Sequence, residues 1–214
     1  MSDVRPTRQR ILDEAMRLFA EQGYKATTVA QIEAAVGLSP GSGSLFKHFP
    51  SKAAVLSEGL EAVLAGREDL VQELRRAASA EGGGGLQGRL EQVALAGLRR
   101  MEADRHVNRL LFGGLQEFPE LLDRYREQEI TANHRAVTAM LQALGGESGA
   151  EADWDAVAAV LVGATAHYWL LSDLFGAHPS GVDEARYAAA SAALLVHMLT
   201  APKARQGADS APGT

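Results

Sequence analysis

A cluster of hydroxyl, basic and aromatic side chains between residues 24 and 52 carries the residue types that contact nucleic acid. Such side chains donate hydrogen bonds to phosphate oxygens, and glycines beside them let a backbone approach the duplex closely. We expect Pro40, Ser42, Ser44 and Lys47 to face bases or phosphates. Contacts with phosphates alone are expected from Tyr24, Thr27, Thr28, His48 and Lys52.

Several of these residues also have a purely structural interpretation. The run from Ser39 to Ser44 contains two glycines, each costing about 1 kcal/mol in a helix, so it could be a plain loop. Thr28 could act as a helix cap alone, and Lys52 could be an ordinary solvated charge. The apolar side chains expected in the core of this segment are Phe19, Leu45, Phe46 and Phe49.

Two helices with clear ends precede the glycine-containing run. Apolar residues at spacings of three and four predict a helix over residues 7–22, which Gly23 ends. Thr28 and Gln31 have the spacing of a capping box, so a second helix begins there and ends at Gly37.

A third helix is expected between Ser39 and Pro50. Ser39 is its predicted cap, and Pro40 occupies the first helical position, where a missing N–H costs nothing. Two short helices joined by a tight turn form the arrangement that places one helix in the major groove of DNA. The segment therefore predicts a helix-turn-helix.

The rest of the chain predicts further helices and no strand, so the expected fold class is all-α. Ser51 is expected to cap a long fourth helix, and Glu81 to Gly85 are expected to form a loop. We predict a DNA-binding domain over residues 1–50, a helical ligand-binding and dimerisation domain over 51–202, and a disordered tail over 203–214. The helices predicted after Pro50 span about 51–78, 86–104, 106–113, 119–144, 153–175 and 182–201.

The last two predicted helices are unusually apolar. Residues 156–172 contain no charge, and a helix that is apolar all round is expected to be buried all round. A membrane span is the rival interpretation, but polar residues interrupt this run and no positive flank accompanies it. We expect a homodimer interface over about 153–201; an internal hairpin within a monomer is the alternative.

Composition limits the other classes of function. The 214 residues include no cysteine and carry a net charge of −6, yet residues 1–52 hold seven Lys/Arg against five Asp/Glu. A mildly basic head on an acidic body is compatible with DNA binding. The amino terminus lacks an apolar signal core, so we expect a cytoplasmic protein. Metal-ligand spacings, phosphate loops and nucleophile motifs are missing from the sequence, which predicts neither an enzyme nor a cofactor.

The predicted body offers candidates for a small-molecule site. A pocket lined by apolar residues with a few directing groups would suit a hydrophobic or aromatic effector. For the two histidines among the candidates, the alternative is a position in the core where other protein groups satisfy their hydrogen bonds. The candidates are Arg109, Tyr125, His134, His167 and Trp169.

The first 56 residues resemble the DNA-binding domain of the tetracycline-repressor (TetR) family of bacterial regulators. The matching pieces are Arg10-Ile-Leu-Asp-Glu-Ala, Leu18-Phe-Ala-Glu-Gln-Gly-Tyr24, Thr27-Thr-Val, Ile32, Gly37-Leu-Ser39, Leu45-Phe46, His48-Phe49 and Ser51-Lys52. The resemblance implies a homodimer that binds a palindromic double-stranded DNA operator, usually represses transcription, and is released by a small effector. It also implies that the effector tilts the long helix over about 51–78.

Three departures from the family pattern stand out. About two extra residues lie between Ser39 and Phe46, Phe46 replaces a usual tyrosine, and Glu33 and Val36 replace small residues. They leave open an alternative function, a helical ligand-binding or interaction module that has lost specific DNA binding.

Overall fold

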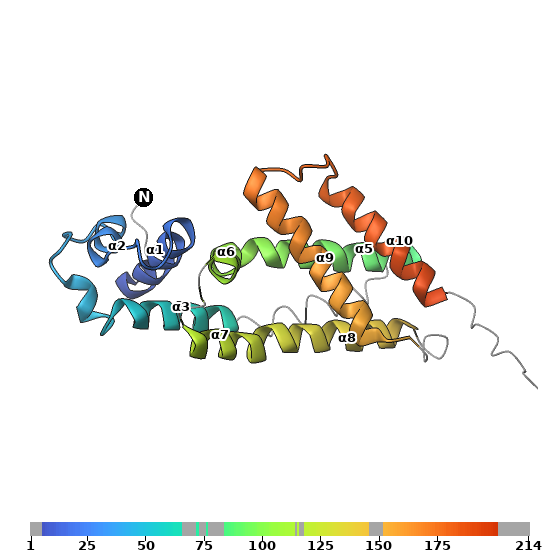
Figure 1. Cartoon of the computed structure of the whole chain (residues 1–214), viewed down its shortest axis with the longest axis horizontal. Coiled ribbons are helices and arrows are strands. Elements are labelled where there is room, and N and C mark those ends of the chain that lie inside the picture. Colours follow the sequence, from blue (N-terminus) through green and yellow to red (C-terminus); the bar gives the residue numbers. More distant parts are fainter. Residues whose placement is uncertain are drawn as a thin grey trace, which may run out of the picture.

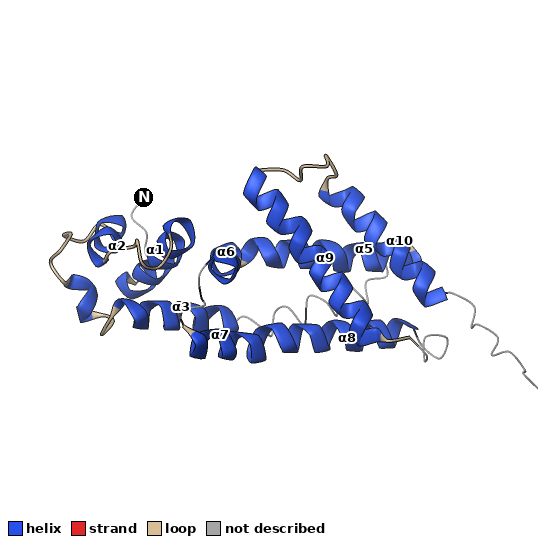
Figure 2. Ribbon diagram, viewed as in Figure 1, coloured by secondary structure: helices blue, strands red, loops and turns tan. Residues whose placement is uncertain are grey.

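The computed structural model describes residues 6–65, 84–113, 118–145 and 152–200, together with residues 72, 76 and 115. Helices and turns make up these ranges, and no strand occurs within them (Figure 2). The all-α prediction is confirmed. The amino-terminal helices lie at one end of an elongated molecule, and the last two helices lie towards the other end (Figure 1).

The amino-terminal head contains α1 (Thr7–Gln22), α2 (Val29–Val36), the 3₁₀ turn η1 (Ser44–Lys47) and the start of α3 (Lys52–Ala65). Local chemistry sets the helix ends as expected. The hydroxyl of Thr28 accepts a hydrogen bond from the backbone N–H of Gln31, which completes the predicted capping box. Gly37 ends α2 in the left-handed conformation with φ 80°.

The core of the head continues into the body. α1 packs against α2, α3 and α6, so the first helix is surrounded by apolar partners. The same buried cluster includes Val107, Leu110, Leu115 and Tyr125 of the body. The head residues of this cluster are Ile11, Leu12, Ala15, Met16, Phe19, Ile32, Val36, Leu45, Phe49, Val55, Leu56 and Leu60.

The body is a bundle in which α5 packs against α9 and α10, and α8 packs against α9. The predicted helix over 119–144 is divided by a π-helical turn, Arg126–Ile130, between α7 and α8. The fourth predicted helix is described as far as Ala65; its continuation and the tail over 203–214 lie outside the described residues. The helices are α5 (Gly85–Ala103), α6 (Arg105–Gly113), α7 (Pro119–Tyr125), α8 (Thr131–Gly145), α9 (Trp154–Phe175) and α10 (Glu184–Thr200).

The composition of the last two helices led us to expect burial all round. Within one chain, they are not buried all round. Each presents an apolar side to the surface, and Val160 of α9 and Leu194 of α10 are 72% and 71% exposed. Leu174 and Phe175 at the end of α9 and Met198 of α10 are also exposed. By length and composition α9 could cross a membrane, and 22% of its most apolar window is buried within the structure. Both helices therefore have an apolar face without a partner within the described chain.

Candidate nucleic-acid interface

The segment expected to form a third helix is mostly a turn. Gly41 and Gly43 have φ values of 74° and 71°, which side chains with a Cβ rarely adopt. The N–H of Ser42 bonds to the carbonyl of Ser39 at 3.2 Å, and regular helix is confined to the 3₁₀ turn Ser44–Lys47. The prediction of a helix from Pro40 onward is therefore wrong, because two left-handed glycines interrupt the helical path.

A buried carboxylate holds this turn in place. The side chain of Glu33 is fully buried on α2. One of its oxygens accepts the backbone N–H of Gly41 at 2.7 Å, and the other accepts that of Leu45 at 3.0 Å. The two hydrogen bonds hold both ends of the segment from Gly41 to Leu45. Glu33 therefore fixes the position of this turn relative to α2.

The exposed end of the head gathers five of the predicted contact residues. Pro40, Ser42, Lys47 and His48 are exposed, and Ser44 is half-buried with its hydroxyl 2.7 Å from that of Ser42. This surface offers hydroxyl, cationic and imidazole groups close to a backbone that the glycines leave uncovered. Such groups suit contacts with both phosphates and base edges.

Phe46 belongs to the same surface, against expectation. It was expected in the core, but its side chain is 54% exposed, whereas Leu45 and Phe49 on either side are buried. The tight 3₁₀ turn explains this difference, because it directs Leu45 inward and leaves the next side chain on the outside.

The two neighbouring threonines have different environments. Thr28 is exposed at the amino terminus of α2, where free backbone N–H groups suit an anion. Thr27 is fully buried, and its hydroxyl donates to the carbonyl of Gly23 at 2.9 Å. A direct contact between Thr27 and a phosphate is therefore not available in this structure, because no part of its side chain reaches the surface.

Lys52 and Tyr24 connect the parts of the head to one another. The ammonium of Lys52 donates to the carbonyls of Tyr24 and Thr27, both at 2.7 Å, and lies 4.1 Å from the centre of the Tyr24 ring. Burial lowers the pKa of Lys52 and raises that of Tyr24. The Tyr24 ring also packs edge-on against Phe118 of the body at 4.7 Å. Both side chains thus have internal structural roles beside any phosphate contact.

A cavity of about 530 Å³ lies where the head meets the body. Charged residues of α1 and of the α5–α6 corner line it together with apolar ones, and Arg17, Arg100 and Asp104 are among them. Arg100 lies 2.7 Å from Asp104, whose pKa is raised by burial against the opposing effect of Arg100. The volume falls within the range of about 300–1,000 Å³ typical of ligand sites.

His106 of α6 also lines this junction cavity. Burial lowers its pKa, nearby arginines add to that effect, and Glu21 opposes it. Its Nδ1 is buried without a hydrogen-bond partner in the part of the chain that the structure describes. A neutral imidazole with an available nitrogen can serve as a directing group for a ligand.

A second, smaller cavity of about 80 Å³ lies between α5, α8 and α9. Its lining is mainly apolar, with Asn133, Thr165 and Arg100 as polar members. Arg100 therefore borders both cavities. The sequence did not indicate Arg100, Asn133 or Thr165 as lining residues, because these three meet at one cavity only through the packing of helices that are distant in the sequence.

The five residues expected to bind a ligand lie apart from the lining of both cavities. Arg109 and Trp169 are brought into one polar network, through hydrogen bonds to Asp173 and Glu102. The remaining candidates are separated from them. Tyr125 is buried in the head–body core, His134 lies 3.5 Å from Asp155, and His167 is exposed on α9. Ligand contacts from these residues stay a prediction.

Glu33, Asp173 and Glu102 are the structurally important residues that the sequence analysis did not assign. Glu33 carried a recognisable signal, because it is a carboxylate beside the apolar side of an eight-residue helix. Asp173 and the contact between Glu102 and Trp169 carried none, since these partners lie more than 60 residues apart in the sequence. Within the described residues, no group of three or more potential metal ligands occurs.

Comparison with known proteins identifies the amino-terminal segment. Residues 11–58 match the family model for bacterial regulatory proteins of the tetR family. An HTH-type transcriptional repressor of Mycobacterium tuberculosis, Rv1474c, is 42% identical over 74 residues, covering 32% of this chain and 38% of that protein. The repressor KstR2 of Rhodococcus jostii is 47% identical over 57 residues, or 27% of each chain. The chain thus spans well under two thirds of the length of these curated relatives.

Solved structures extend the likeness to the whole fold. A putative tetR family transcription regulator from Shewanella sp. PV-4 is 25% identical with a TM-score of 0.58, covering 89% of this chain and 96% of that one. The fatty acid degradation regulator FadR from Bacillus halodurans shares the fold with a TM-score of 0.66 at 19% identity, over 95% and 100% of the two chains. These relatives are regulators rather than enzymes. Residues 11–58 thus match the tetR family model, and the chain shares the all-α fold of solved regulators of that kind.

Proposed function

We propose that this chain is a ligand-responsive repressor that binds a palindromic operator as a homodimer. The observation that carries the proposal is the head itself, in which a buried Glu33 presents an exposed turn containing Pro40, Ser42, Lys47 and His48. A turn with Gly41 and Gly43 in left-handed conformations, followed by the 3₁₀ turn Ser44–Lys47, stands where a short third helix was expected. Contact with DNA then depends on the turn and on the 3₁₀ helix that follows it.

The exposed apolar sides of α9 and α10 support the homodimer. Val160, Leu174 and Leu194 are more than 60% exposed, and large apolar side chains left exposed along a helix commonly mark an interface. Small residues next to them, Gly163 and Ala193, let two helices approach closely. An isologous dimer would use the same pair of helices from each protomer, and its two heads would match the symmetry of a palindrome.

The junction cavity supports regulation by a small molecule. It is lined by α1 of the head and by the α5–α6 corner of the body, so an occupant would contact both parts. Its charged lining favours an effector with polar groups, which refines the expectation of a largely apolar one. An occupant that binds better when the head is displaced would release DNA by shifting the population of head positions.

A fluorescence-anisotropy titration tests the DNA-binding proposal. The probe is the DNA directly upstream of the gene, with scrambled DNA as competitor. We expect specific binding by two chains per site that weakens steeply as salt increases. Equal affinity for both DNAs at low salt would favour the alternative of a helical module without specific DNA binding.

Lys47 provides a sharper prediction about the interface. Replacing Lys47 with alanine should weaken binding to specific and scrambled DNA alike and reduce the salt slope by about 1 per protomer, as expected for one lost phosphate contact. Arg126→Ala is the matched control, because it removes the same charge from an exposed side chain of the body. An unchanged salt slope in the Lys47 variant would show that Lys47 does not contact a phosphate.

A further inference from the structure

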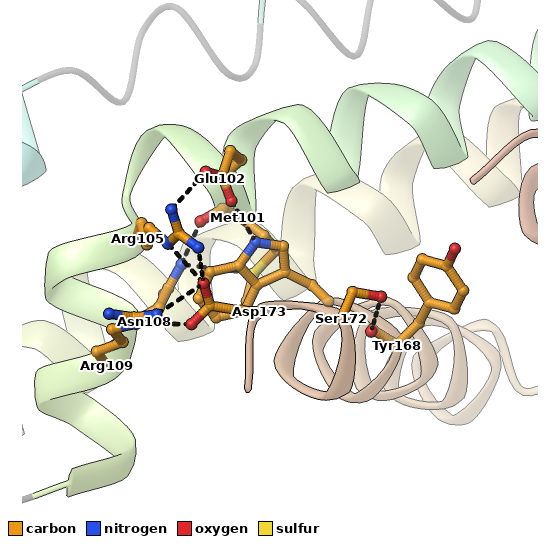
Figure 3. A network of polar contacts seen from close by, with 9 residues as sticks. Met101, Glu102, Arg105, Asn108, Arg109, Tyr168, Ser172 and Asp173 are labelled. Carbon is orange, nitrogen blue, oxygen red and sulfur yellow. Dashed lines mark hydrogen bonds and ion pairs between the residues drawn. The ribbon is translucent and has the colours of Figure 1, made fainter. Parts of the chain in front are cut away.

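A buried carboxylate links the end of α9 to α6. The side chain of Asp173 is 3% exposed, and Arg109 donates to it from Nε at 2.6 Å and from Nη2 at 3.1 Å. Arg105 of the same helix also pairs with it (Figure 3). Burial alone would raise the pKa of Asp173, but the hydrogen bonds from Arg109 and Arg105 outweigh burial and hold the pKa below its ordinary value. The carboxylate is therefore charged at neutral pH.

The network around Asp173 is balanced in charge and reaches α5. Glu102 pairs with Arg105 at 3.4 Å and accepts the indole N–H of Trp169 at 3.0 Å. Asn108 of α6 donates to the carbonyl of Met101 at 2.8 Å. Two arginines and two carboxylates thus connect α5, α6 and α9, and a satisfied polar network of this kind favours one fixed arrangement of its helices.

α6 uses opposite faces for the head and for this network. At about 100° per residue, Arg105 and Arg109 share one side of the helix, while Val107 and Leu110 lie on the other. Val107 and Leu110 are buried in the cluster that contains the core of α1. α6 therefore lies between α1 of the head and Asp173 of α9.

The other end of this path is the proposed dimer surface. Leu174 and Phe175 follow Asp173 directly and are 66% and 64% exposed. A shift of α9 at the dimer interface would thus reach α6 through Asp173 and then reach α1 through the apolar contacts of α6.

We propose that Asp173, with Arg105 and Arg109, is a positioning element that sets the distance between the two DNA-binding heads of the dimer. The proposal rests on the proposed function, since it needs a dimer that binds two half-sites. Half-sites one helical turn apart are separated by about 34–36 Å, so both heads can bind only if that distance is held. The network thereby determines which spacing of half-sites the protein accepts.

Asp173→Asn tests this role on operators that differ only in spacing. The duplexes contain the two half-sites of an operator selected in vitro, at the selected spacing and at spacings one or two base pairs longer or shorter. We expect the preference of the wild-type protein for the selected spacing to fall about tenfold in the variant, a size typical of coupling between sites. Affinity for a single half-site and the dimer dissociation constant, measured by sedimentation, should stay unchanged.

Asp155→Asn is the matched control, because it makes the same change on the same helix. Asp155 accepts from Thr138 of α8 at 3.0 Å, so its loss affects the α8–α9 contact. This control should keep the spacing preference. If Asp173→Asn does not fold, Arg109→Gln removes the hydrogen bonds from the partly exposed Arg109 to Asp173 and leaves the pair with Arg105 in place.

The outcomes separate this inference from the proposed function. A wild-type protein that binds no selected DNA overturns both proposals. A wild-type protein with a strict spacing preference that Asp173→Asn and Arg109→Gln both retain overturns the positioning role alone. Loss of half-site affinity together with loss of spacing preference would also count against it, because that result indicates general damage to the head.

Discussion

Replacing Glu33 with glutamine is expected to reduce operator affinity by about ten- to a hundredfold. The carboxylate of Glu33 accepts two backbone N–H groups, from Gly41 and Leu45. A carboxamide has one oxygen, so its NH₂ group would face one of these donors. A buried donor left unsatisfied costs about 1–3 kcal/mol, and each 1.4 kcal/mol is a factor of ten in affinity. Binding would have to supply the energy that orders the turn.

The sign of this effect separates it from simple electrostatics. Glu33→Gln removes a negative charge from the head, which by charge alone should strengthen binding to phosphates. Glu21→Gln is the matched control, because it removes the same charge from an exposed residue of α1 that pairs with Arg17. We expect the control to bind as well as the wild-type protein or slightly better, while the Glu33 variant binds more weakly.

Hydrogen exchange measured by NMR checks the cause. The amide protons of Gly41 and Leu45 should exchange faster in Glu33→Gln, whereas those of α1 should keep their protection. Unchanged exchange at both amides together with unchanged operator affinity would show that Glu33 does not organise the turn.

The ends of the head helices could be predicted from sequence because short-range chemistry sets them. Thr28 and Gln31 are three residues apart, and Gly23 and Gly37 directly follow the helices they end. In each case the residues that make the contact are neighbours in the chain. The described helices of the body also followed from the spacing of their apolar residues, apart from the π-helical turn Arg126–Ile130.

The turn that contains Gly41 and Gly43 could not be predicted, because its shape depends on contacts across a longer range. Glu33 binds N–H groups eight and twelve residues further on, and propensity rules contain no information about such pairs. A serine cap followed by Pro40 is a good helix start by local rules, yet Gly41 and Gly43 take left-handed conformations instead. The exposure of Phe46 follows from that turn, so it was mispredicted for the same reason.

The places that the predicted ligand-contact residues of the body take in the structure depend on long-range contacts. Aromatic and histidine side chains were reasonable ligand contacts, yet Trp169 donates to Glu102 and Arg109 binds Asp173. Both contacts join residues more than 60 positions apart. Which polar side chains line a cavity depends on how helices cross, and the cavities are lined by Arg100, Asn133 and His106 instead.

A charged residue on the apolar face of α9 and α10 is expected to have the second large effect. Leu174→Glu and Leu194→Glu place carboxylates at positions that are 66% and 71% exposed in the single chain, so each protomer should still fold. In a dimer the same positions would bring like charges into an apolar interface, which is strongly unfavourable. We expect sedimentation to show a monomer with an unchanged helical circular-dichroism spectrum.

Loss of the dimer should reduce affinity for the full operator about 10²- to 10⁴-fold, because the second head no longer binds at a high effective concentration. Affinity for a single half-site should be unchanged, since the residues of the head are untouched. Ile130→Glu is the matched control, because Ile130 is an apolar residue that is 50% exposed in the π-helical turn beside α8, outside the α9–α10 face. If Leu194→Glu stays dimeric while Ile130→Glu becomes monomeric, the dimer forms through another surface, and the path from Asp173 to the interface fails with it.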